Sequence, residues 1–241
     1  MTLPKIDVPV YNLTIPSTGE EIKVRPFTVK EEKLLLMAVE SNNMEDVTNQ
    51  VKQIITNCII TKDVNIDKLP FFDIDYMFIF LRAKSVGEKV EVRMTCNNVL
   101  EDSSVCNHMF PAELDIANVD VVKDENVSND IKLDKTNGVI MKYPNYSIIK
   151  RLENTAENDK KTAIIVASID YIYDKKGTYS SKDYSREDLT KFVEDLTEEN
   201  YKKLEYFVDN FPVFLAKLDV TCPKCGYDHH VRYSDFYDFF T

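Results

Sequence analysis

The residues of this chain whose type and spacing could do chemistry are its cysteines, and two of them stand in a tight turn. Residues 218–226 read Leu-Asp-Val-Thr-Cys-Pro-Lys-Cys-Gly, so two residues separate Cys222 from Cys225. This spacing lets both thiolates point at one ion, while Pro223 presets φ and Gly226 tolerates the left-handed conformation that closes the turn. The sequence therefore predicts a zinc knuckle, which supplies two of the four ligands of a tetrahedral site.

The other two ligands are expected from Cys96 and Cys106. Cys96 follows a strand pattern as Cys222 does, and residues 97–105 separate it from Cys106. A loop of this length can still bring both thiolates to one metal, because the entropy of loop closure rises slowly with length. Four thiolates leave no coordination position open, so we predict a structural Zn²⁺ site and not a catalytic one, with the ligands Cys96, Cys106, Cys222 and Cys225.

The remaining candidate ligands are three histidines and the fifth cysteine. His108, His229 and His230 are alternatives if one cysteine does not bind, but a strand position without metal is the favoured interpretation for all three. Cys58 ends the apolar stripe of a helix, so we expect it to behave as a small buried hydrophobic residue.

Sequence motifs for catalysis are absent from the chain. It contains no Gly-x-Ser-x-Gly, no Walker loop, no Gly-x-Gly-x-x-Gly and no His-Glu-x-x-His. A zinc deaminase would need a His-x-Glu, which is also missing. We therefore predict that the protein is not an enzyme.

Composition and charge indicate a globular, acidic protein. Hydrophobic residues make up 44% of 241 residues, and 41 acidic against 30 basic side chains give a net charge of −11. Such a chain is a poor binder of nucleic acid or anionic membrane, so neither is expected as a partner. No apolar run reaches the ~20 residues that span a bilayer, and the first residues lack the pattern of a signal peptide. We expect a reducing cytoplasm, where paired cysteines hold metal more often than they form disulfides.

The first half of the chain alternates strand and helix patterns. A capping box, Thr28-Val-Lys-Glu31, predicts the start of a helix after the first hairpin. The expected elements are a hairpin within 8–25 ended by Pro26, helices over 28–39, 47–58 and 73–84, and strands over 89–95 and 110–116.

The second half repeats much of this order. The expected elements are a hairpin over 131–133 and 139–143 ended by Pro144, a helix near 147–152, a helix carrying Ile164, Ile165, Ile169 and Ile172 that stops at Lys175-Lys-Gly177, an additional helix opened by Ser185, a helix over 197–211, and the strand before Cys222.

The shared order predicts an α+β fold with an internal duplication. Each half would hold a β-hairpin, a few helices and a β-hairpin bearing a cysteine knuckle, and a zinc-ribbon-like site would join the halves. The predicted boundaries are 1–121 for the first repeat, 122–130 for a charged linker and 131–241 for the second repeat. The alternative is that two unrelated α+β segments share an order by chance.

Aromatic residues crowd the C-terminal segment 233–241. We expect Tyr233 and Phe236 to pack on the core. For Phe239 and Phe240, packing on the core and docking on a partner both stay open.

The pattern resembles the baseplate hub subunits and hub assembly proteins of T4-like contractile-tailed phages. The resemblance rests on Lys-Val-Arg-Pro-Phe-Thr-Val-Lys-Glu-Glu at 23–32, on the short helices after it, and on Val-Thr-Cys-Pro-Lys-Cys-Gly at 220–226 with its flanking strands. The stretched spacing of Cys96 and Cys106 departs from a paired-knuckle scheme. The resemblance implies a non-enzymatic structural or assembly role in the virion tail baseplate, or in the host cytoplasm during assembly. It also implies partners among other hub, spike or tape-measure proteins.

Two rival classes of function stay open. The first is a zinc-ribbon nucleic-acid-binding or transcription-related module. Its weakness is that only Lys217, Lys224 and Arg232 supply positive charge near the knuckle. A hydrolase with a metal-bound water would need an open coordination position.

Overall fold

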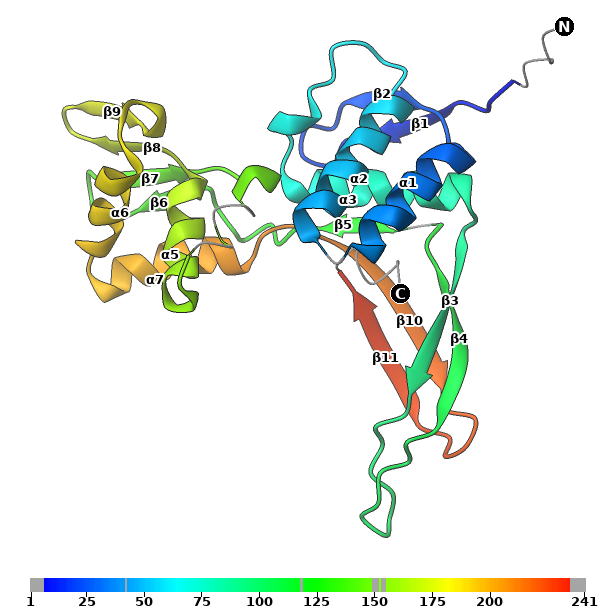
Figure 1. The fold of residues 1–241 in the computed structure, drawn as a ribbon. Coiled ribbons are helices and arrows are strands. Elements are labelled where there is room, and N and C mark those ends of the chain that lie inside the picture. Colours follow the sequence, from blue (N-terminus) through cyan, green and yellow to red (C-terminus); the bar gives the residue numbers. More distant parts are fainter. Residues whose placement is uncertain (1–6, 42, 118, 149–151, 153–154, 235–241) are drawn as a thin grey trace, which may run out of the picture. The chain divides into compact units, whose positions relative to one another are not determined.

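The computed structural model describes residues 7–41, 43–117, 119–148, 152 and 155–234 (Figure 1). The chain forms two compact units, each described here by itself. Unit 1 comprises Met1–Ile66, Phe72–Val122 and Val213–Thr241, and unit 2 comprises Asp67–Phe71 and Lys123–Pro212. Helices and small antiparallel sheets occur in both, so the fold class is α+β. Among the described helices, none is long and apolar enough to cross a membrane.

Unit 1 opens with the predicted hairpin, β1 (Tyr11–Thr14) and β2 (Glu21–Val24). The strands pair antiparallel from Tyr11↔Val24 to Thr14↔Glu21. Alternate side chains point into the core, and Leu13, Ile22 and Val24 are at most 2% exposed. The period of two therefore fixes the buried face of this hairpin.

Three helices form the core of unit 1: α1 (Val29–Glu40), α2 (Met44–Cys58) and α3 (Phe71–Ser85). In α2 the predicted apolar stripe is buried, and Cys58 is 0% exposed within it. This burial confirms the prediction of a small buried residue and raises the pKa of the Cys58 thiol to about 12. A short 3₁₀ helix, η1 (Ile66–Lys68), precedes α3.

Helix α3 is buried on most of its surface, and one of its buried residues is a carboxylate. Asp73 is 0% exposed. It accepts hydrogen bonds from the Ser17 backbone N–H, at 2.9 Å, and from the Ser17 hydroxyl. Burial raises the pKa of Asp73, while the two bonds from Ser17 oppose that rise. The pair fastens the β1–β2 turn to the first turn of α3.

Two hairpins complete unit 1. The first is β3 (Lys89–Thr95) with β4 (Met109–Asp115), and the second is β10 (Val213–Thr221) with β11 (Asp228–Tyr233). β5 (Asp120–Val122) pairs with the other edge of β10, giving the order β11-β10-β5. The strands of both hairpins were predicted, whereas β5 was not, because three residues carry no periodic pattern of their own.

Unit 2 holds a four-stranded antiparallel sheet in the order β6-β7-β8-β9. Buried apolar residues of the sheet and of α5, α6 and α7 form one core, which includes Val139, Ile165, Val193 and Phe207. The elements are β6 (Asp130–Lys132), β7 (Gly138–Met141), η2 (Tyr146–Ile148), α5 (Glu157–Ser168), β8 (Ile169–Asp174), β9 (Gly177–Ser180), η3 (Ser181–Asp183), α6 (Arg186–Glu194) and α7 (Glu198–Asp209).

The helix predicted to carry Ile164, Ile165, Ile169 and Ile172 is confirmed only as far as Ser168, and the prediction is wrong beyond it. Helix α5 ends at Ser168, and the next residues form β8. The isoleucine spacing suits a helix, but Ile-Asp-Tyr-Ile-Tyr is rich in the β-branched and aromatic residues that favour strands. The expected helix end at Lys175-Lys-Gly177 is instead the β8–β9 turn, where Asp174 accepts hydrogen bonds from the N–H groups of Lys176 (2.6 Å) and Gly177 (3.0 Å).

Other predictions concern residues that the structure describes in part or not at all. Phe236, Phe239 and Phe240 lie outside the described residues, as do residues 149–151 of the expected helix near 147–152. Tyr233 is half-buried, and its hydroxyl lies 3.7 Å from the Met94 sulfur. One boundary between the two units falls after Val122, and another falls after Pro212. Compactness does not decide which segments are equivalent repeats, so the repeat boundaries stay a prediction.

The start of α1 shows how one carboxylate links a helix cap to an ion pair. The Thr28 hydroxyl and the Glu31 backbone form the predicted capping box, with 2.7 Å from the Thr28 N–H to Glu31 Oε2. Arg25 donates two further hydrogen bonds to the same carboxylate, at 2.9 and 3.1 Å. The Arg25 guanidinium is the main cause that lowers the pKa of Glu31 to about 2.

We predict that Glu31→Gln lowers the free energy of unfolding at pH 7 by about 1 kcal/mol, because it removes the charge and keeps a capping side chain. The folded pKa lies below the ordinary value of 4.5, so this stabilisation is present above that pH and is lost as the pH falls toward about 2. Urea unfolding should show a smaller difference in the free energy of unfolding between wild type and variant at pH 3 than at pH 7. Glu40→Gln, an exposed change on the same helix, should have no effect at either pH.

Candidate metal centre

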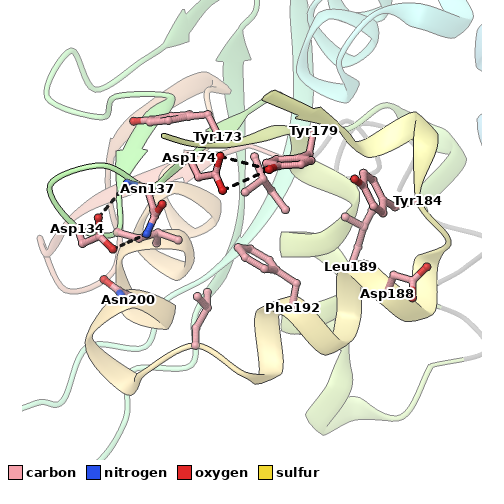
Figure 2. Close-up of a pocket in the computed structure, with 13 residues that line it drawn as sticks. Asp134, Asn137, Tyr173, Asp174, Tyr179, Tyr184, Asp188, Leu189, Phe192 and Asn200 are labelled. Atoms are coloured by element: carbon pink, nitrogen blue, oxygen red, sulfur yellow. Dashed lines mark hydrogen bonds between the residues drawn. The ribbon is translucent and has the colours of Figure 1, made fainter. Parts of the chain in front are cut away.

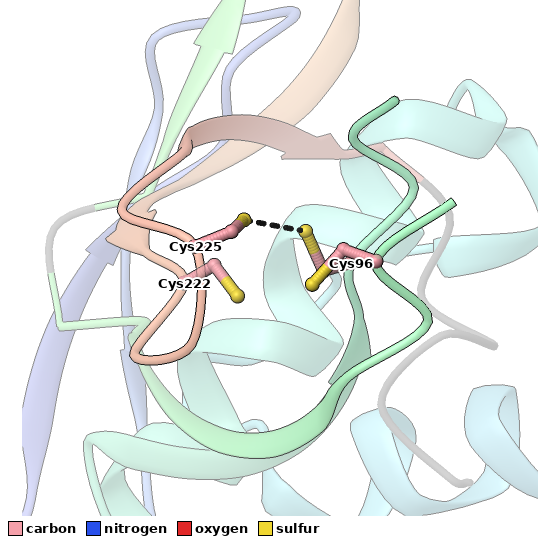
Figure 3. A group of neighbouring side chains, drawn as sticks. Cys96, Cys222 and Cys225 are labelled. Atoms are coloured by element: carbon pink, nitrogen blue, oxygen red, sulfur yellow. Dashed lines mark hydrogen bonds between the residues drawn. The ribbon is translucent and has the colours of Figure 1, made fainter. Parts of the chain in front are cut away.

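The four predicted cysteines lie together in unit 1. The sulfur atoms of Cys96, Cys106, Cys222 and Cys225 are all within 4.8 Å of one another. Cys96 Sγ and Cys225 Sγ are 3.6 Å apart (Figure 3). A disulfide would need about 2.05 Å, whereas thiolates around a zinc ion at about 2.3 Å lie about 3.8 Å apart. The thiols are therefore free, and their spacing fits four ligands of one ion.

The β3–β4 and β10–β11 hairpins each contribute two cysteines from the tip. Cys96 follows β3 and Cys106 precedes β4, while Cys222 follows β10 and Cys225 precedes β11. The two tips come from segments far apart in the sequence, since Cys96 and Cys225 are 129 residues apart. An ion held here would join the two hairpins.

The knuckle of the second hairpin is closed by two backbone hydrogen bonds. The Cys222 N–H donates to the Tyr227 carbonyl at 2.8 Å, and the Gly226 N–H donates to the Cys222 carbonyl at 2.9 Å. Gly226 has φ 73°, as expected from the sequence. Because it lacks a Cβ, it adopts this left-handed conformation without the steric cost that other residues incur.

The first hairpin closes in the same way despite its longer loop. The Cys96 N–H donates to the His108 carbonyl at 2.9 Å, and the Asn107 N–H donates to the Cys96 carbonyl at 3.0 Å. Asn107 has φ 48°, so it fills the place that Gly226 fills in the other knuckle. This left-handed position of Asn107 was not predicted from the sequence, although asparagine tolerates the left-handed region better than most residues do.

The inserted residues 97–105 fold back on themselves outside the knuckle. Val99 and Val105 form an antiparallel bridge, and the Cys106 N–H donates to the Asn98 carbonyl at 2.9 Å. This small closed loop brings Cys106 back beside Cys96. Loop length therefore does not decide where the sulfur atoms lie.

Burial and hydrogen bonding act on the thiols in opposite directions. Cys96 is 0% exposed, Cys222 1% and Cys106 4%, while Cys225 is half-buried. Burial raises the pKa of Cys96, because a buried thiolate without a counter-ion is costly. The Tyr227 backbone N–H is the main cause that lowers the pKa of Cys225 to about 6, and the Asn98 side chain adds to it. A bound cation would supply the positive charge that balances four neighbouring thiolates.

Apolar and aromatic side chains surround the sulfur atoms. Phe110 is buried against the cysteines, with Met94, Leu100 and Val220 partly buried beside it. His229 is 7% exposed, and its ring lies 4.9 Å from the Tyr227 ring and 6.1 Å from the Phe110 ring, centroid to centroid. Among the described residues, the group of candidate ligands contains only the four cysteines. The histidines are therefore not needed to complete the set.

The arrangement can hold one ion and offers no free ligand position. Four sulfur donors in a tetrahedral group favour Zn²⁺ or iron over hard cations such as Mg²⁺ and Ca²⁺. The surrounding side chains exclude solvent from three of the four sulfurs. A closed set of four thiolate ligands is typical of structural zinc sites.

We predict that Gly226→Ala lowers the free energy of unfolding by about 1 kcal/mol through backbone strain alone. A Cβ there would meet no atom within 4 Å, so steric contact adds nothing. Urea unfolding should show this loss, whereas Asn107→Gly, the matched change in the other knuckle, should leave stability unchanged or raise it slightly. Equal stability of Gly226→Ala and wild type would contradict the need for a left-handed residue.

Comparison with known proteins assigns the chain to a family. The family model described as "T4 bacteriophage base plate protein" matches residues 8–241. No curated protein and no solved structure matches this chain. The family match covers nearly the whole sequence and confirms the resemblance to baseplate proteins of T4-like phages. The chain belongs to the T4 bacteriophage base plate protein family.

Proposed function

We propose that the protein is a non-enzymatic structural or assembly component of the phage baseplate hub. The observation that carries this proposal is the family match over residues 8–241, which implies a place at the tail of a virion. The closed cysteine centre supports a structural role, since it offers no coordination position for a substrate. The protein acts through contacts with other hub, spike or tape-measure proteins, in the virion or in the host cytoplasm during assembly.

The ion at Cys96, Cys106, Cys222 and Cys225 is Zn²⁺ in this proposal. Zinc has no redox chemistry and accepts tetrahedral thiolate ligands readily, so it suits a permanent structural site. The ion fixes the tip of the β3–β4 hairpin to the tip of the β10–β11 hairpin. This cross-link stiffens a part of unit 1 that has few other buried apolar residues around it.

An internal duplication, with repeats 1–121 and 131–241 joined by residues 122–130, is part of the same proposal. The matching hydrogen bonds of the two knuckles support it. A second match lies at the opening hairpins. The Arg25 N–H donates to the Cys58 carbonyl at the end of α2 (2.9 Å), and the Lys142 N–H donates to the Ser168 carbonyl at the end of α5 (2.7 Å).

The strand pairings next to these bonds also correspond. Val24 of β2 pairs with Ile59, the residue after α2, and Met141 of β7 pairs with Ile169, the residue after α5. In both halves a helix therefore returns the chain to the second strand of its opening hairpin. The additional helix α6 and strand β9 have no counterpart in the first half.

Charge argues against the rival role as a zinc-ribbon nucleic-acid-binding or transcription-related module. The net charge is −11. Near the knuckle, Lys224 is already engaged by the Cys106 carbonyl at 3.3 Å. Affinity for phosphate backbones needs free basic side chains in number, which this surface does not offer.

We predict about one zinc per chain in protein purified without added metal, measured by elemental mass spectrometry. Cys222→Ser and Cys106→Ser should each lose most of the zinc, because each removes one of four ligands. Cys58→Ser is the matched control: it removes a buried thiol outside the cluster and should retain the zinc. Bound zinc should be released on acidification, because protons compete for the thiolates. Iron in place of zinc, or no metal at all, would contradict the assignment.

We further predict that the affinity-tagged protein, isolated from infected cells, carries other hub, spike or tape-measure proteins identifiable by mass spectrometry. Contacts of this kind bury apolar surface, so they should survive moderate salt. Binding to a DNA or RNA probe that disappears with salt, together with no co-purifying tail protein, would favour the nucleic-acid-binding module instead.

A further inference from the structure

Unit 2 contains a cavity that the cysteine centre does not involve. It has a volume of about 690 Å³ and lies between the sheet, the turn after β6, and helices α6 and α7 (Figure 2). The volume falls in the range of ligand-binding pockets, about 300–1,000 Å³. Its wall combines aromatic rings with carboxylates.

The aromatic part of the wall comes from β8, β9 and α6. The rings of Tyr179 and Tyr184 meet edge to face, with centroids 6.4 Å apart. Tyr184 is 45% exposed, and Phe192, which also lines the cavity, packs against the core of unit 2. Aromatic faces of this kind attract cations through their negative quadrupole.

Three carboxylates line the same cavity, and two of them accept backbone hydrogen bonds within their own turns. Asp134 accepts hydrogen bonds from two backbone N–H groups at 2.7 and 2.9 Å, and Asp174 accepts two at 2.6 and 3.0 Å. These bonds lower the pKa of Asp134 to about 2 and also lower that of Asp174. Asp188 accepts hydrogen bonds from the N–H (3.2 Å) and the hydroxyl (2.7 Å) of Ser185, the N-cap residue of α6. No lysine or arginine is among the described residues that line the cavity, so its wall is negative.

We propose that this cavity binds a basic segment of a partner protein, an arginine or lysine side chain flanked by apolar residues. The apolar stem would contact Leu189 and Phe192, and the cationic group would lie against the tyrosine faces within the field of the carboxylates. Charge complementarity selects this occupant. The chain's own acidic C-terminal segment, with Asp235 and Asp238, is unsuited to a negative cavity. The proposal rests on the assembly role proposed above and specifies the chemistry of one partner contact.

The test is a titration of the full-length, isotope-labelled protein with three peptides, followed by backbone amide NMR signals. The peptides are acetyl-Leu-Arg-Leu-amide and its glutamine and glutamate analogues. We expect the arginine peptide to shift signals of residues around 134–137, 172–179 and 184–192, and to bind at least about threefold more tightly than the glutamine peptide. The glutamate peptide should bind most weakly.

Two variants and a matched control locate the effect. Asp188→Asn removes the charge and keeps an oxygen that can cap α6, and Tyr184→Leu removes an aromatic face from an exposed position. Each should weaken the arginine peptide about threefold. Glu187→Gln, in the same helical turn but outside the cavity wall, should leave the affinity unchanged.

Equal binding of the arginine and glutamine peptides, tighter binding of the glutamate peptide, or no shift around the cavity at millimolar peptide would each overturn the proposal. Isolation of the Asp188→Asn and Tyr184→Leu proteins from infected cells distinguishes failure of the cavity proposal from failure of the assembly role. If tail proteins co-purify undiminished with both variants, the cavity is not a partner site but the assembly role stands. If wild type carries no tail protein while the arginine peptide still binds the cavity as expected, the assembly role fails instead.

Discussion

The close approach of four cysteine sulfurs is the constraint on which unit 1 depends. Few buried apolar residues surround the two hairpin tips, and four thiols packed within 4.8 Å are costly to ionise without a cation. The ion proposed for this centre would resolve both problems with one set of bonds. The two knuckles place their sulfurs by the same backbone hydrogen bonds, so the centre depends on turn geometry more than on the lengths of the loops.

The helical part of unit 1 is stabilised differently, by local signals that agree with the packing. A capping box starts α1, an apolar stripe buries α2, and α3 is surrounded on most of its sides. Two of its buried carboxylates have side-chain partners: Arg25 for Glu31, and Ser17 for Asp73. Unit 2 uses the same devices, with capping side chains at Ser185 and Thr197 over a separate core. Its acidic, aromatic cavity is the feature that sets it apart.

Much of this could be predicted from the sequence because the signals are local. The capping box at Thr28, the stripe ending at Cys58 and the Cys-Pro-Lys-Cys-Gly turn each depend on residues within a few positions of one another. Predictions failed where pairing decides the structure. Ile169 suits a helix by spacing, and only its pairing with β7 makes it a strand residue. β5 exists because β10 offers an edge, and the role of Asn107 becomes visible only beside Gly226.

Unit 1 is built from segments before and after unit 2, so the order of synthesis determines when unit 1 can be completed. Cys96 and Cys106 are made early, but their partners follow only after all of residues 123–212. Until then the first knuckle has two thiols and no means of enclosing an ion in a four-sulfur site. Unit 2, which is nearly continuous, can fold while the chain is still growing, whereas unit 1 can be completed only by its last strands. Binding of the proposed metal would thus be a late event that follows synthesis of the last strands.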